Sequence, residues 1–195
     1  MTTSQSGRVW SALIAILGIF LLNGLLVSSI IGWIDSRKDK WLKGDIKYPC
    51  FLRRKEHYVI VGGNDMAFGI VRQILTKETP NLPYILIQTT CDVEGFRREL
   101  FSTLNKQQQQ HIIIFYGSRT SKDELENLVL RQAKEIYILG EQTRTDELEP
   151  YHDTINMQCF DLLSQIAQEY NDCKDCIKCY VMFEYQASFA AFQSS

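Results

Sequence analysis

The chain has 195 residues, of which 45% are hydrophobic and 23% charged, a balance typical of folded domains and not of disordered or collagen-like chains. Its formal net charge is -2, which argues against a nucleic-acid partner, since binding one would require an excess of Lys and Arg. Six cysteines are too few for a disulfide scaffold in a chain of this length, so a reducing compartment fits them better.

Near the N-terminus, residues Val9 to Ile34 form one uncharged and strongly apolar run. At about 1.5 Å of rise per residue, a helix of this length crosses a hydrocarbon core of about 30 Å. Trp10, Trp33 and Trp41 lie at or just beyond its ends, where indole rings favour the membrane interface. A secretory signal peptide would have a shorter apolar core followed by a small-residue cleavage site. The run therefore predicts a transmembrane helix.

Basic residues are distributed unequally on the two sides of this helix. Arg8 alone precedes it, whereas the following segment holds Arg37, Lys38, Lys40, Lys43, Lys47, Arg53, Arg54 and Lys55. Because cytoplasmic flanks carry the excess of Lys and Arg, we expect a single-pass membrane protein with its C-terminal part in the cytoplasm.

Small and polar residues within the run suggest that the helix contacts other helices. Gly24, Ser28 and Gly32 are spaced by four and share one face, where they allow close approach of a neighbouring helix. This face serves either ordinary helix packing or a pore lining in which Asn23 faces a polar interior. Because a single helix forms no conduit, the chain either assembles through this helix or is part of a larger membrane unit.

After a basic linker over 35–56, short apolar runs alternate with amphipathic stretches. The runs are His57–Val61, Tyr84–Gln88, His111–Phe115, Glu135–Leu139 and Lys178–Phe183, and helical spacing recurs over 67–76, 93–105, 122–132 and 154–170. Continuous apolar runs suit strands buried on both faces of a parallel sheet. We therefore predict the α/β class, with a Rossmann-like doubly wound sheet over 57–195. Residues 1–34 form an N-terminal tail and the transmembrane helix, and the linker joins them to the sheet. The ligand crevice is expected at the carboxyl ends of the strands.

The first predicted strand leads into a glycine-rich turn where Rossmann folds bind phosphate. The turn reads Gly62, Gly63, Asn64, Asp65 and, further on, Gly69. This spacing departs from G-x-G-x-x-G, because Asn64 stands where the second glycine of the motif is required. Close packing of strand against helix is the alternative explanation for these glycines.

The second predicted strand lacks the acidic residue that binds ribose hydroxyls in nicotinamide-binding domains. Gln88, Thr89 and Thr90 stand at its end instead. We therefore expect no tight binding of NAD, although a nucleotide or ion ligand stays open.

The histidines and cysteines do not form a recognisable catalytic or metal site. His57, His111 and His152 are scattered along the chain. Cys173, Cys176 and Cys179 lack the fourth cysteine and the proline of an iron–sulfur motif, and zinc would need Cys159 or His152 as a fourth ligand without a recognised pair spacing. We expect free thiols, no metal and no enzymatic activity.

Several motifs, in their order after the apolar helix, are similar to a known family. They are the basic linker that ends at His57, the strand and turn HYVIVGGND, and the later stretch YGSRTSKDELENLVLRQAKEIYILGE. The chain resembles ion channels with regulator-of-K+-conductance (RCK, or TrkA-N) domains, and among them the Castor/Pollux type. The matched positions are Gly62, Asn64 and Asp65 in the turn, Gly117 and Ser118 after the third strand, and Leu125, Leu128, Ala133, Lys134, Ile136 and Leu139 beyond.

The resemblance implies the last pore-lining helix of a channel joined to its first regulatory lobe. It implies a non-enzymatic, ligand-dependent regulatory part of a potassium or other cation channel, in four-fold assembly. The expected ligand-binding residues are Gly62, Gly63, Asn64, Asp65, Gly69, Gln88, Gly117 and Ser118. The alternatives are a membrane-anchored NAD(P)-dependent oxidoreductase, with the pyrophosphate on Gly62–Gly69, and a purely structural membrane adaptor.

Overall fold

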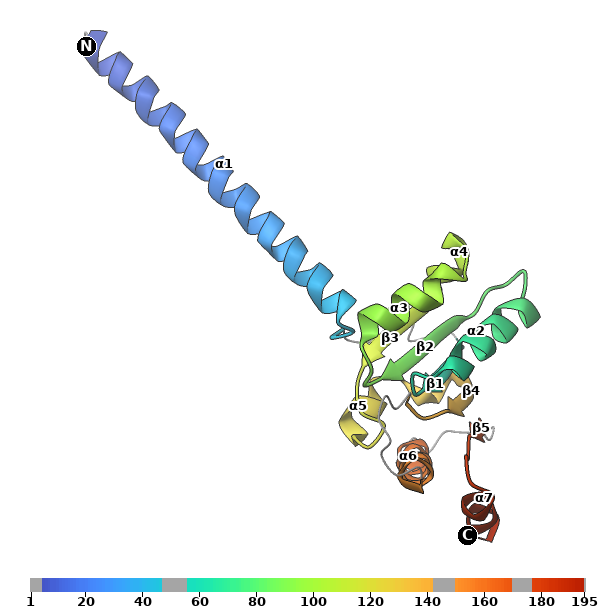
Figure 1. Ribbon diagram of the computed structural model, residues 1–195. Helices are drawn as coiled ribbons and strands as arrows, with labels where there is room; N and C mark the ends of the chain where they lie inside the picture. Colours follow the sequence, from blue (N-terminus) through green and yellow to red (C-terminus); the bar gives the residue numbers. More distant parts are fainter. Residues whose placement is uncertain (1–4, 47–55, 142–149, 170–176, 195) are drawn as a thin grey trace. The chain divides into compact units, whose positions relative to one another are not determined.

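The computed structural model of the chain describes residues 5–46, 56–141, 150–169 and 177–194 (Figure 1). The chain divides into two compact units with their boundary between Trp41 and Leu42. The linker positions 47–55 and the cysteines Cys173 and Cys176 lie outside the described residues.

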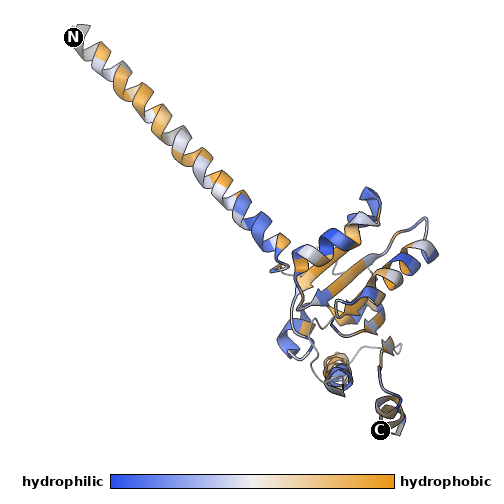
Figure 2. Cartoon of the chain, viewed as in Figure 1, coloured by the Kyte–Doolittle hydropathy of each residue, from blue (hydrophilic) through white to orange (hydrophobic). Residues whose placement is uncertain are grey.

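Helix α1 extends over Gln5–Leu42, and all of it except Leu42 belongs to the first unit. Its stretch Val9–Leu42 is long and apolar enough, by length and composition, to cross a membrane. Figure 2 shows the apolar residues along most of α1 and polar residues toward Leu42. The helix continues eight residues beyond the predicted end at Ile34, because the charged sequence DSRKDKWL contains no glycine or proline that would end it.

The second unit contains one parallel five-stranded sheet in the order β3-β2-β1-β4-β5. The strands are β1 (His57–Val61), β2 (Tyr84–Thr89), β3 (Ile112–Tyr116), β4 (Ala133–Ile138) and β5 (Lys178–Val181). All five predicted strands are present, each within two residues of its predicted bounds. The strand order reverses between β1 and β4, and ligands of doubly wound sheets bind at such a switch point.

The helices of this unit cover both faces of the sheet (Figure 1). They are α2 (Asp65–Lys77), α3 (Val93–Ser102), α4 (Lys106–Gln109), α5 (Lys122–Glu126), the 3-10 turn η2 (Leu130–Gln132), α6 (Pro150–Glu169) and α7 (Gln186–Ser194). The predicted helix over 122–132 is interrupted, because Val129 adopts a left-handed conformation with φ of 48°. The short helix α4 and the C-terminal helix α7 were not predicted.

Two apolar cores hold the sheet, one on each face. Tyr58 and Ile60 of β1 pack with α2 and α3, whereas Val59 and Val61 of the same strand pack with α5 and α6. Successive side chains of a strand point to opposite faces, so a continuously apolar strand contributes side chains to both cores. This arrangement confirms the predicted α/β class and doubly wound sheet.

Candidate functional site

The glycine turn after β1 packs tightly against the ends of the neighbouring strands. Gly62 has a φ of 114°, and a Cβ at this position would lie 2.2 Å from the backbone oxygen of Gly140, which follows β4. Its amide donates to the carbonyl of Gln88 over 2.8 Å. The turn therefore needs glycine at Gly62 for its own backbone conformation and for contact with β4.

Asn64 occupies the N-cap of α2 and links this helix to β4. Its Oδ1 accepts the amide of Ala67 over 3.3 Å, and its Nδ2 donates to the carbonyl of Leu139 over 2.9 Å. Asp65, the first residue of α2, is exposed. Gly69 lies further along α2, where a Cβ would meet no atom within 4 Å, so it makes no close approach to the turn.

The other expected ligand-binding residues come together beside β2 and β3. The side-chain amide of Gln88 donates to the carbonyl of Ser118 over 2.9 Å, and a Cβ on Gly117 would lie 3.0 Å from that amide nitrogen. The amide of Ser118 in turn donates to the carboxylate of Glu124. Gln88, Gly117 and Ser118 therefore form one contiguous group at the carboxyl ends of these two strands.

A residue that the sequence interpretation did not single out, Glu141, lies in the centre of this edge. Its Oε2 accepts the amide of Gly63 over 2.9 Å and the hydroxyl of Thr89 over 2.5 Å. Its Oε1 accepts the amide of Thr90 over 2.9 Å, and the Cys91 thiol donates to Oε2 over 3.1 Å. Because residues that follow a parallel strand at the switch point line the crevice, the position of Glu141 after the fourth strand was an available signal.

A buried arginine, Arg119, follows β3, and its guanidinium lies beside Gly140. Its Nη1 donates to Oδ1 of Asn156 over 2.7 Å and its Nη2 to Nδ1 of His152 over 3.1 Å. Burial lowers the pKa of the Arg119 guanidinium, while the nearby Glu141 carboxylate opposes that shift. Within the described ranges, no carboxylate forms an ion pair with Arg119.

The three histidines lie in separate places. His57 opens β1, with its Nε2 3.0 Å from the carbonyl oxygen of Leu128, and His111 stacks on Tyr84 just before β3. Only His152, beside Arg119, lies near the carboxyl edge.

Of the cysteines considered for metal binding, Cys159 is buried in α6 and Cys179 packs against the same core from β5. Among residues that the structure describes, no group of three or more His, Cys, Asp or Glu side chains is placed to hold a metal ion. The other two thiols of the cysteine run lie outside the described residues.

Within helix α1, the face of Gly24, Ser28 and Gly32 is exposed in the single chain. A Cβ at Gly24 or Gly32 would meet no atom within 4 Å. The side chain of Asn23 lies outside the described residues. The face is therefore open to a neighbouring helix.

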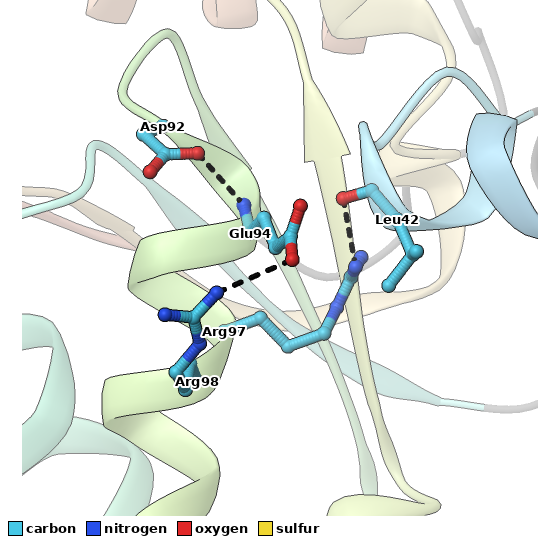
Figure 3. Close-up of polar contacts among 5 residues, drawn as sticks. All are labelled: Leu42, Asp92, Glu94, Arg97 and Arg98. Atoms are coloured by element: carbon cyan, nitrogen blue, oxygen red, sulfur yellow. Dashed lines mark hydrogen bonds and ion pairs between the residues drawn. The ribbon is translucent and has the colours of Figure 1, made fainter.

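The last residue of α1 is tied to the sheet domain by Arg97 (Figure 3). The buried Arg97 guanidinium of α3 donates to the carbonyl of Leu42 over 2.8 Å, while the neighbouring Arg98 is exposed and pairs with Glu94. Burial lowers the pKa of Arg97, and the charge of Glu94 opposes that shift. Leu42 is therefore part of the second unit.

Gly44 fixes the same junction to the edge of the sheet. It has a φ of 74°, its carbonyl accepts the amide of Tyr116 over 3.0 Å, and a Cβ would lie 2.5 Å from that amide nitrogen. A glycine in the left-handed conformation is the common way to end a helix.

Comparison with known proteins supports this architecture. No family model and no curated protein sequence matches the chain. Among solved structures it is similar to the GsuK channel bound to NAD (TM-score 0.55) and to GsuK bound to ADP (TM-score 0.53), each at 13% identity over 100% of this chain. The chain spans 30% and 44% of the lengths of those two chains. At this identity the likeness concerns the fold alone, an α/β domain with a parallel sheet.

Proposed function

We propose that this chain is the membrane-tethered regulatory portion of a cation channel, a potassium channel of the Castor/Pollux type by its resemblance. The observation that carries the proposal is the continuity between the apolar helix and the Rossmann-like domain. Helix α1 ends at Leu42, and its last carbonyl and Gly44 are bonded to Arg97 and Tyr116 of the domain. A ligand that favours one arrangement of such domains would act on the helix through these contacts.

The proposed ligand is a nucleotide or an ion that binds at the carboxyl edge of the sheet. The two similar GsuK structures are those of a channel bound to NAD and to ADP, and they match the whole of this chain. The expected group Gln88, Gly117 and Ser118 and the glycine turn lie at this edge. The end of β2 carries no acid for ribose hydroxyls, so we propose no tight NAD site.

The proposed organisation follows the predicted domains. Residues 1–34 supply a tail and membrane helix, 35–56 the basic connection, and 57–195 the cytoplasmic regulatory domain. The chain acts as a homo-oligomer, four-fold by its resemblance, or together with other channel segments. It performs no catalysis in this role.

The test is whether a nucleotide moves the membrane helices. A spin-labelled unnatural amino acid at the exposed Ser36 of α1 reports distances between protomers of the full chain in nanodiscs. We expect millimolar ADP or NADH to shift the distance distribution, because ligand binding changes the arrangement of the attached domains. An unchanged distribution with bound nucleotide would contradict the regulatory role, and NADH oxidation by the same sample would favour the oxidoreductase alternative.

A further inference from the structure

The amide of the glycine turn, which binds phosphate in dinucleotide folds, is already bonded to an internal anion. The Glu141 carboxylate accepts donors from Gly63 after β1 and from Thr89 and Thr90 at the end of β2. In Rossmann folds the pyrophosphate lies against the turn that follows the first strand. One side chain from the end of β4 therefore satisfies the donor that a phosphate would use.

The surroundings of Glu141 leave little room for a phosphate beside it. A Cβ on Gly63 would lie 2.4 Å from Oγ1 of Thr89 and 3.2 Å from Oε2 of Glu141. The turn and the carboxylate are thus in direct contact. A phosphate can reach the amide of Gly63 only if the carboxylate leaves.

The charge at the turn also disfavours a phosphate. Asp65, in the first turn of α2, places a second carboxylate near the amino end of this helix, where its dipole favours a negative group. The buried Arg119 guanidinium, whose Nη1 lies 2.9 Å from the position of a Cβ on Gly140, donates to Asn156 and His152 and forms no hydrogen bond with Glu141. A nucleotide phosphate would therefore meet like charge at the turn.

We infer that Glu141 determines the ligand selectivity of the crevice by excluding phosphate groups from the glycine turn. A nucleotide engages the turn only after the Glu141 carboxylate has been displaced, whereas a nucleoside without phosphate does not compete with it. The inference rests on the proposed function, because it takes this crevice as the ligand site.

The test compares ADP with adenosine on the full chain in detergent by isothermal titration calorimetry. Glu141→Ala removes the carboxylate that is bonded to the amide of Gly63, and Glu141→Gln removes the charge while preserving the shape of the side chain. We expect both variants to bind ADP about tenfold more tightly than the unmodified chain, a change of about 1.4 kcal/mol, with adenosine affinity unchanged. The matched control is Glu124→Gln, because Glu124 also accepts a backbone amide at this edge, that of Ser118, but does not contact the glycine turn.

Equal ADP affinity in the unmodified chain and both folded Glu141 variants, including no binding by any of them, would overturn the inference. A cooperative thermal unfolding transition establishes that each variant is folded. If Glu141→Ala does not fold, Glu141→Gln alone is compared with the unmodified chain. Low-micromolar ADP binding by the unmodified chain would also overturn it, yet leave the regulatory function standing. Conversely, Glu141→Ala could bind ADP more tightly while the distances between Ser36 labels do not change when ADP is added. That result would support the role of Glu141 and contradict the proposed function.

Discussion

The thiol of Cys159 is enclosed by the core between the sheet and α6, with Cys179 packed against the same core. Burial raises the pKa of Cys159 to about 12 and that of Cys179 to about 11, from an ordinary value of 9.0. Because the folded chain holds these protons more tightly than the unfolded chain, both thiols contribute stability below pH 9 that is lost as the pH rises toward 11 and 12.

This linkage predicts that the midpoint of guanidinium-induced unfolding falls between pH 8 and pH 10.5. The decrease of the unfolding midpoint should be smaller in Cys159→Ala, because this substitution removes one of the titrating groups. Tyr58, whose pKa is also raised by burial, contributes to the remainder. The measurement is the unfolding midpoint of both chains in detergent at the two pH values. An identical pH dependence in the two chains would show that Cys159 is not held protonated by the fold.

At the residue scale, strand assignments suffice to bring Gln88, Gly117 and Ser118 to one edge of the sheet, whereas the contact of Glu141 with the glycine turn does not follow from them. Gln88, Gly117 and Ser118 meet because the ends of adjacent parallel strands share one edge, a rule that needs only strand assignments. The contact between Glu141 and Gly63 joins residues 78 positions apart. No local pattern marks a carboxylate that folds back onto a turn, so this contact depends on the tertiary arrangement.

At the scale of elements, the junction after α1 offers two arginines with contrasting environments. Arg97 is buried and bonded to the carbonyl of Leu42, whereas the Arg98 side chain is 78% exposed and pairs with Glu94 (Figure 3). A hydrogen bond from a charged donor contributes about 1.5–3 kcal/mol, whereas an exposed ion pair contributes about 0–1 kcal/mol.

We therefore predict that Arg97→Met weakens the attachment of Leu42 within the second unit and that Arg98→Met does not. Methionine preserves much of the apolar stem, so the change removes mainly the hydrogen bond. Hydrogen exchange of the full chain should be at least roughly tenfold faster over residues 40–46 in Arg97→Met, since local opening becomes easier. Equal exchange rates in the two variants would argue that Leu42 is held by other contacts.

The elements were predictable where the local sequence favours only one type of secondary structure. β1, β2 and β3 are rich in Ile, Val, Tyr and Leu, as suits strands covered on both faces, so composition alone predicts them. The end of α1 and the break at Val129 were not predictable in the same way. Charged residues 35–42 are compatible with both helix and linker, and a left-handed valine has no local sequence signal.

At the scale of the whole molecule, α1 is the element whose apolar side chains stay exposed in the single chain. From Val9 to Trp41, every residue whose exposure is described is exposed, apart from the half-buried Gly18. A helix that is apolar on all sides requires lipid or other helices around it. The open face of Gly24, Ser28 and Gly32 is the place where close helix contact would occur.

We predict that the full chain forms a homo-oligomer in mild detergent and that Gly24→Leu or Gly32→Leu dissociates it. Neither glycine has a neighbour within 4 Å of an added Cβ, so the larger side chain does not clash within its own chain and acts on the contact between chains. Ala15→Leu is the matched control: nine residues at about 100° each place it on the side of α1 opposite Gly24. Multi-angle light scattering should give an oligomeric mass for the unmodified chain and the control, and a smaller mass for the two glycine variants. A monomeric unmodified chain, or an oligomer that survives both substitutions, would mean that α1 only anchors the domain and would remove the physical basis for a helix bundle acting as a pore.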